Sequence, residues 1–186
     1  MTANKRFKRR VRERAQRTGE SYTAALRHLR NRESEEAAME WQRIEKPEYG
    51  YAIGLPVGWT EQPPDLRNSP LETARFVDPE DRRHSLIVFR SMPALGTTAR
   101  RLADGTQRVL ELKGWLDLSV TEATFGGATG IRLDAVKRDA GREMAIRQYF
   151  VAVGEVGLIL ASNTIAPDED DALLTEISVR FEILVD

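Results

Sequence analysis

The sequence has no cysteine and only two histidines among its 186 residues. Without cysteine the chain has no disulfide, no thiolate metal site, no cysteine nucleophile and no lipid anchor on an N-terminal Cys. It also lacks a run of 18 apolar residues, and residues 5 to 14 are dominated by Lys and Arg where a signal peptide would be apolar. We therefore expect a cytoplasmic protein without membrane contact, stabilised by packing alone.

The few histidines also restrict the chemistry that the chain can perform. Neither His28 nor His84 has a second ligand at metal spacing, so we expect both on the surface. His84 and Ser85 are adjacent and no GxSxG motif is present, so no Ser-His-Asp triad is predicted. The acidic run 168–171 lacks the ligand spacing of a calcium loop and instead fits the first turn of a helix. We expect no catalytic residue, no metal, no cofactor, and hence no enzyme.

What the sequence does contain is a clear β pattern between Ala128 and Asn163. Two alternating apolar and polar runs are separated by Asp139–Arg142, and Gly154 and Glu155 precede a third, almost wholly apolar run, 156–162. A period of two with turn residues at this spacing predicts an antiparallel meander of three strands. The apolar last strand indicates burial on both faces, near the middle of the sheet.

Further strands and helices flank the meander. We predict strands at 49–55, 72–77, 85–90 and 115–124, a helix from about 99 to 114 that Thr97 or Thr98 caps, and a last helix from Pro167. That helix is expected to bury Leu173, Leu174, Ile177, Phe181 and Leu184. The fold class is therefore α+β: an antiparallel sheet of about six or seven strands in the order βββαββββα, with packed helices. The Gly126-Gly127 pair predicts a turn and not a phosphate loop, because strands lie on both sides of it.

The N-terminal residues 1–45 differ from this domain of residues 46–186. Residues 1 to 32 hold 11 Lys and Arg against two Glu, while the rest of the chain has a net charge of −10. Two short helices are expected here, with Gly19 ending the first and Ser21 beginning the second. The second is expected to continue to an apolar group at Met39, Trp41 and Ile44. We expect such a basic arm to have its own partner or to fold back on the acidic domain.

The order of elements, the stretch Tyr51–Trp59, the Gly126-Gly127 turn and the final Ser178–Phe181 resemble the PsbP-like superfamily from about Tyr49 to Asp186. This resemblance implies an α/β/α sandwich. The superfamily includes the photosystem II protein PsbP, LpqN-type lipoproteins, a Ran-binding import factor and chaperones of type VI secretion effectors. Most of its known members bind proteins or small ligands and are not catalysts. The lipoprotein members have a signal peptide and a Cys, which this chain lacks, and its basic arm resembles a short appendage with no assigned activity.

Two functions follow as alternatives. The first is a non-catalytic cytoplasmic binding module, an adaptor or chaperone, whose unknown protein partner contacts a sheet face or the polar loop 61–70. Its predicted contact residues are Trp59, Glu61, Asp65 and Arg67. The second is a protein that binds nucleic-acid phosphates without sequence preference through the arm. Its contact residues would be Lys5, Arg6, Lys8, Arg9, Arg10, Arg12, Arg14 and Arg17.

Overall fold

A computed structural model describes residues 3–37, 39–81, 84–92, 96–139 and 142–184. The chain forms two compact units, Met1–Glu40 and Trp41–Asp186. Among the described residues, no helix combines the length and apolar character that a membrane crossing requires.

The first unit is a hairpin of two helices, α1 (Ala3–Thr18) and α2 (Tyr22–Ala37). Gly19 ends α1 with a φ of 73°, a left-handed conformation that favours glycine, and its N–H bonds the Ala15 carbonyl at 3.1 Å. Ser21 then accepts a hydrogen bond from the Ala24 N–H at 3.2 Å, so both predicted helix ends are confirmed. A small cluster of Val11, Ala25 and Leu29 joins the helices.

The second unit begins with a small antiparallel sheet that the sequence did not predict. Its order is β1 (Trp41–Lys46), β2 (Tyr51–Pro56), β10 (Phe181–Ile183), and a 3₁₀ turn, η1 (Pro47–Tyr49), joins the first two. The expectation that the second helix reaches Trp41 and Ile44 was wrong: α2 ends at Ala37, and residues 41–45 belong to the sheet and not to the arm.

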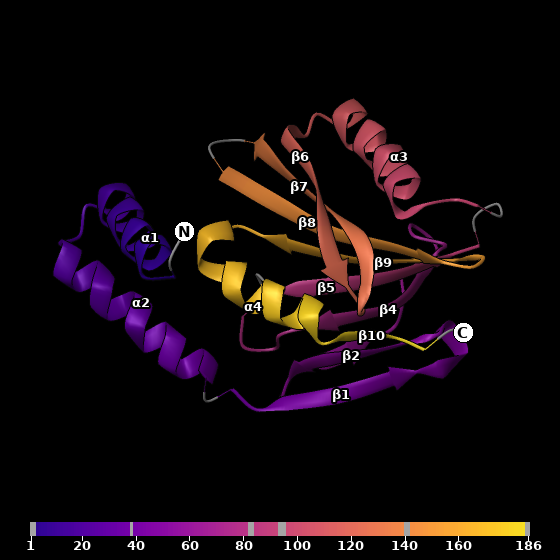
Figure 1. The fold of residues 1–186 in the computed structure, drawn as a ribbon, viewed down its shortest axis with the longest axis horizontal. Coiled ribbons are helices and arrows are strands. Elements are labelled where there is room, and N and C mark those ends of the chain that lie inside the picture. Colours follow the sequence, from indigo (N-terminus) through magenta and orange to yellow (C-terminus); the bar gives the residue numbers. More distant parts are fainter. Residues whose placement is uncertain (1–2, 38, 82–83, 93–95, 140–141, 185–186) are drawn as a thin grey trace. The chain divides into compact units, whose positions relative to one another are not determined.

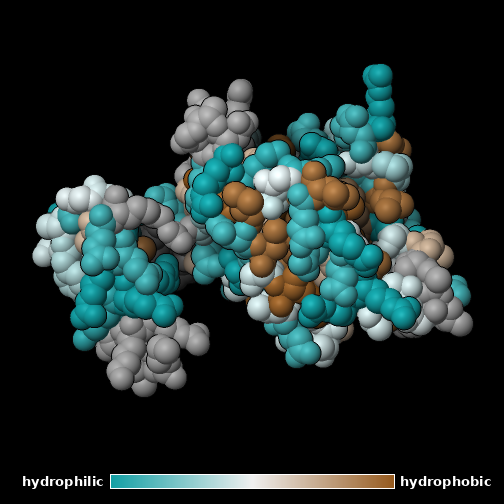
Figure 2. Space-filling view, turned by 90° about the horizontal axis from the view of Figure 1, so that it is seen from above, coloured by the Kyte–Doolittle hydropathy of each residue, from teal (hydrophilic) through white to brown (hydrophobic). Residues whose placement is uncertain are grey.

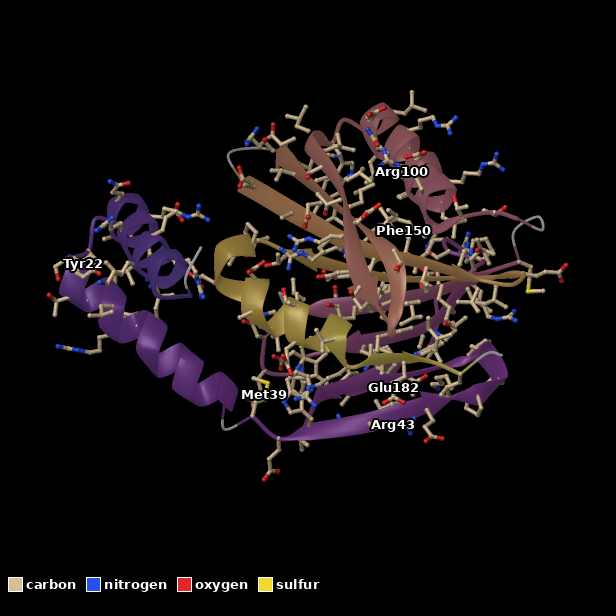
Figure 3. All side chains as sticks on the ribbon, viewed as in Figure 1. Tyr22, Met39, Arg43, Arg100, Phe150 and Glu182 are labelled. Atoms are coloured by element: carbon tan, nitrogen blue, oxygen red, sulfur yellow. The ribbon has the colours of Figure 1, made fainter. Side chains whose placement is uncertain are left out.

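The outer strands of the small sheet also touch each other across β2. Arg43 of β1 bonds Glu182 of β10 through two atom pairs, at 3.0 and 2.8 Å (Figure 3). Arg180 lies over the Trp41 ring, 4.3 Å from its centre. Gly54 of β2 permits this approach, because a Cβ there would lie 2.8 Å from the Arg180 Cβ. The two strands from opposite ends of the domain therefore form one unit with β2.

The larger sheet has seven antiparallel strands in the order β3-β4-β5-β9-β8-β7-β6. Their bounds are β3 (Thr60–Gln62), β4 (Glu72–Val77), β5 (Ser85–Ser91), β6 (Leu116–Phe125), β7 (Ala128–Asp139), β8 (Arg142–Val153) and β9 (Val156–Thr164). The predicted meander is thus present as β7, β8 and β9, and β9 is the central strand as expected. The Gly126-Gly127 turn is confirmed, with positive φ at both glycines, whereas the middle of the turn at 139–142 lies outside the described residues.

One face of the larger sheet is covered by α3 (Ala99–Leu112) (Figure 1). Of the two predicted candidates, Thr97 and Thr98, the N-cap is Thr98, which accepts a hydrogen bond from the Arg101 N–H. Beneath the helix lies a core of Ala103, Leu110, Ile131, Leu133, Ala135, Ile146 and Phe150. Within each strand these residues are two or four apart, so they share one face and the residues next to them point to the other face.

That other face packs against α4 (Pro167–Val179) and the small sheet. A series of aromatic rings links the sheets. Between ring centres, Tyr51 of β2 lies 5.2 Å from Phe181, Phe181 lies 4.5 Å from Phe125 in a tilted arrangement, and Phe125 lies 5.5 Å from Tyr149 of β8. The α+β class and the layered order are confirmed, but Phe181 lies in β10 and not in the last helix, and Leu184 is exposed.

Candidate functional site

One end of the seven-stranded sheet brings together residues that are distant in the sequence. At this end Leu116 of β6 pairs with Val136 of β7, Val136 with Ala145 of β8, and Ala145 with Thr164 of β9. Ser85 of β5 pairs with Asn163, and α4 begins three residues after β9. We call this region the site end of the sheet.

A hollow of about 280 Å³ lies at the site end between the start of α4 and strands β6 to β8. It is lined by Asp117, Arg132, Asp134, Ala135, Val136, Ala145, Ile146, Arg147, Thr164, Pro167 and Leu174. The aliphatic residues come from β7, β8 and α4, and the charged ones from β6, β7 and β8. Its volume is near the lower limit for small-molecule sites and is sufficient for a side chain of a partner.

The charges around the hollow form one connected network. Arg147 has a side chain only 10% exposed, and it donates to Asp134 at 2.9 Å and to Asp171 of α4 at 2.7 Å. Arg132 also donates to both oxygens of Asp134, at 2.6 and 3.0 Å. Burial acts to lower the pKa of Arg147, and these carboxylates outweigh it and raise the pKa above its ordinary value. Arg147 joins Asp134 of β7 to Asp171 of α4, so the network fixes α4 on the sheet. Both guanidinium groups have a carboxylate partner, so the positive charges that line the hollow are balanced by negative ones.

Large apolar side chains are also exposed at the site end, on the end of α3 and the starts of β6 and β8. Val109 and Leu112 lie at the end of α3, Leu116 begins β6, and Met144 lies near the start of β8; Leu112 is 89% exposed. The domain shows a cluster of hydrophobic residues bordered by hydrophilic ones on the side where α3 and the start of β6 lie (Figure 2). In addition, β6 is the last strand of the sheet, so within the described chain its outer edge pairs with no strand.

A polar cluster around His84 lies at the same end, and it corrects our expectation of a surface histidine. His84 is only 8% exposed. Its Nδ1 lies 3.1 Å from Asp78 Oδ2, and its Nε2 lies 3.2 Å from Asp170 Oδ1. Its ring stacks on the Trp59 ring, with 5.9 Å between the ring centres. The nearby Asp170 carboxylate is the largest cause of a raised pKa at His84; burial opposes this, and the hydrogen bond with Asp78 adds to it.

The cluster connects with the hollow through Thr164. The Thr164 hydroxyl donates to the fully buried Asp170, accepts from the Ala166 N–H at 2.9 Å, and lines the hollow. The hydroxyl therefore faces a carboxylate, whereas in a catalytic triad it would face the imidazole. Among the described residues, no group of three or more His, Cys, Asp or Glu could hold a metal ion.

Sequence reasoning missed His84 because Asp170 lies in a different element, far along the chain. The acidic run 168–171 predicts only a charged first turn, but its members have different roles: Asp170 lies 3.2 Å from His84, and Asp171 binds Arg147. The local signal was Asp78 and Asp81 before His84, two acids in a turn next to the one histidine of the domain.

The predicted partner-binding residues lie in two places. Trp59 is only 7% exposed, so most of its ring packs on His84 and little is left for a partner. Glu61 is exposed on β3 and accepts from Lys46 at 2.7 Å. Asp65 and Arg67 lie beyond β3; Arg67 is exposed, and Asp65 accepts from the Asn68 side chain at 2.8 Å, which lowers the pKa of Asp65.

The predicted phosphate-binding residues all lie on α1. Lys8, Arg9 and Arg12 are exposed, and Arg9 lies 3.4 Å from Glu13. Arg10 is half-buried, and Arg14 is largely covered and donates to Glu20 at 2.6 Å. The side chains of the remaining three, Lys5, Arg6 and Arg17, are outside the described residues.

Comparison with known proteins finds a shared fold and no sequence family. No family model matches the chain, and no curated protein matches it. Solved structures do match: cyanobacterial PsbP (CyanoP) from Synechocystis sp. PCC 6803 has a TM-score of 0.57 at 16% identity and covers 78% of this chain and 93% of its own. LpqN of Mycobacterium tuberculosis, described as involved in cell envelope biogenesis, has a TM-score of 0.53 at 18% identity, with coverage of 79% and 92%.

A third match, a structure from Bacteroides thetaiotaomicron, has a TM-score of 0.57 at 10% identity and covers 80% of this chain and 50% of its own. Identities this low establish the architecture and no shared activity. With its seven-stranded antiparallel sheet between α3 on one face and α4 on the other, the chain has the PsbP-like fold.

Proposed function

We propose that this protein is a non-catalytic cytoplasmic protein-binding module, an adaptor or chaperone, whose partner docks at the site end of the sheet. One observation carries the proposal: a hollow with aliphatic walls lies at the same end of the sheet as four exposed large apolar side chains and the outer edge of β6, the last strand of the described sheet. Exposed apolar clusters of this kind mark interaction sites on soluble domains.

The features of the site end supply the parts of a protein interface. Leu112, Leu116 and Met144 offer apolar area that water would leave on contact. The hollow accepts one apolar anchor from the partner, which is where interface energy concentrates. The edge of β6 offers backbone groups to an extended segment.

The usable length of that edge is limited by the backbone at its start. Asp117 has a φ of 52°, and the β6–β7 register shifts between Leu116 and Ser119. A bulge of this kind twists an edge away from further pairing. The partner's strand therefore pairs beyond Ser119, and the apolar residues before it contact side chains only.

The experiment compares partner capture by the full chain and by surface variants. Leu112→Asp and Leu116→Asp place charges at the site end, and Val179→Asp is the matched control, because Val179 is an exposed apolar residue of α4. We expect a protein that the wild type and Val179→Asp retain equally and that both site-end variants lose, with affinity reduced at least tenfold when that protein is purified. If all three variants retain the partner, docking at this end is contradicted. If the pure protein turns over a substrate and one polar substitution abolishes that turnover, the non-catalytic role is contradicted.

The arm supports a second candidate, a nucleic-acid-associated protein. Lys8, Arg9 and Arg12 are exposed on α1, while Val11 of the same helix is buried in the hairpin. Such a face binds phosphates without reading bases, and log K on duplex DNA falls by about 0.9 per log unit of salt for each phosphate neutralised. We expect weak binding to random duplex that is lost by about 0.2 M salt. Tight binding that survives this salt, and disappears in a Lys8→Gln, Arg9→Gln, Arg12→Gln variant, would favour this second function.

A further inference from the structure

The outer edge of β1 pairs with no strand within the described chain, and the backbone there is regular. All six residues of β1 pair with β2 without a register shift, and the strand contains no Gly or Pro. By contrast, β6 begins with a bulge, and β3 has only three residues. The lysine of β1, Lys46, is held by Glu61 of β3 at 2.7 Å. Bulges, prolines and very short strands are the usual obstacles to edge pairing, and β1 has none of them (Figure 1).

The backbone groups that point to this edge follow from the pairing on the other side of β2. The Gly54 N–H donates to the Arg180 carbonyl at 2.9 Å, so Gly54 directs its backbone groups toward β10 and away from β1. Gly54 lies opposite Arg43, which makes this a pair without hydrogen bonds between its two members. The N–H and C=O groups of Arg43 therefore point to the outer edge. Because the direction alternates along a strand, those of Trp41 and Glu45 do so too.

The charges on this edge fit a second copy of β1. When two identical strands pair antiparallel about an axis at Ile44, Arg43 of each copy lies opposite Glu45 of the other. Both are residues whose backbone groups point outward, so each such pair exchanges two backbone hydrogen bonds and brings opposite charges together. An axis at Arg43 or at Glu45 would instead place like charges opposite each other, which is destabilising. The charge pattern therefore selects one register.

The other face of the strand supplies an apolar contact in the same register. Ile44 points to the face opposite Arg43 and Glu45, in one row with Ile53 of β2 and Phe181 of β10. It is only half-buried in the single chain. With the axis at Ile44, the two copies of this residue face each other in a pair without backbone bonds, where side chains approach most closely. Pairing thus removes further apolar surface from water.

We propose that two copies of this chain associate through β1, with the two-fold axis at Ile44, and join their small sheets into one continuous sheet in the order β10-β2-β1-β1-β2-β10. A contact between two short edges is small beside the interface of a permanent dimer, so the association is reversible and depends on concentration. It uses no residue of the hollow or of β6, and it goes beyond the proposed function.

Sedimentation velocity on the full chain, from about 1 µM to about 1 mM, tests the proposal with complementary charge variants. Arg43→Glu places Glu opposite Glu at both positions, and Glu45→Arg places Arg opposite Arg. We expect each variant alone to associate at least about tenfold more weakly than wild type. Mixed in equal amounts, they regain opposite charges at both positions and should form a heterodimer. The control is Glu182→Gln, which removes the partner of Arg43 within the chain, leaves the edge unchanged and should dimerise.

A disulfide tests the register, since the chain has no cysteine of its own. Ile44→Cys places two thiols across the axis, and we expect oxidised glutathione to link them. In Gln42→Cys the two thiols are four residues apart along the strands, about 13 Å, and should stay unlinked. Circular dichroism checks that each variant folds, and if Ile44→Cys does not fold, the charge variants still decide.

Three results would each overturn the proposal. The first is a wild type that stays monomeric over the whole concentration range. The second is a mixture of Arg43→Glu and Glu45→Arg that associates no better than either variant alone. The third is a dimer that Leu116→Asp dissociates and Arg43→Glu leaves intact, because copies would then meet at the site end and not at β1.

Discussion

Phe181 is the residue whose truncation tests the architecture most directly, because it joins the two sheets. Its side chain is 1% exposed, and its ring lies between Tyr51 of β2 and Phe125 at the end of β6. The Phe181→Ala variant removes this ring from the middle of the series of aromatic rings and leaves the backbone pairing of β10 with β2 intact.

The expected loss of stability is about 3–5 kcal/mol, the usual range for truncating a buried Phe to Ala. Two ring contacts, each worth about 0.5–1.5 kcal/mol beyond buried area, place the value in the upper part of that range. For a domain of this size each kcal/mol lowers Tm by about 2–4 °C, so we expect a decrease of roughly 10 °C or more.

Urea unfolding followed by circular dichroism measures the loss, and the m-value must stay constant for a two-state comparison. Val179→Ala is the control, because Val179 lies two residues earlier and is 67% exposed; its effect should stay within about 0.5 kcal/mol. A loss below about 1 kcal/mol for Phe181→Ala at an unchanged m-value would show that the rings do not hold the two sheets together.

Three further outcomes are expected. Deletion of residues 1–40 should leave the melting transition of the domain nearly unchanged, whereas deletion of 1–46 removes β1 from β2 and should lower it clearly; equal curves would mean that β1 adds nothing. Thr98→Ala should cost about 1 kcal/mol in chemical unfolding through loss of the α3 N-cap, with Thr97→Ala as the neutral control. Gly126→Ala should cost more than Gly127→Ala: both have positive φ, but only at Gly126 would a Cβ meet Ile183, at 2.6 Å, and equal losses would contradict this close approach.

Where a strand buries one face and ends in a turn, the sequence alone was sufficient to locate it. The alternation of β7 and β8, the apolar run of β9, the cap at Thr98 and the Pro167 start of α4 were all predicted from local patterns. These features are local because a period of two, a cap or a proline acts on neighbours a few residues away.

The strands that were missed owe their structure to partners far along the chain. Trp41, Arg43 and Ile44 show no apolar alternation, and β1 forms because β2 offers a complete backbone ladder. Phe181 continues the helical spacing of α4 after Ile177 and was assigned to that helix, but its pairing with Ile53 makes it a strand residue. The role of His84 depended likewise on α4 contributing Asp170, which no local spacing reveals.

The position of β2 affects the order of events during synthesis of the protein. All six residues of β2 are buried, yet β10, one of its two neighbours, is encoded near the opposite end of the chain. A ribosome that adds about 5–20 residues per second exposes the apolar surface of β2 for several seconds before Phe181 emerges to cover it. During this interval the nascent chain presents a half-finished sheet, and we expect the need for chaperone protection to be greatest then.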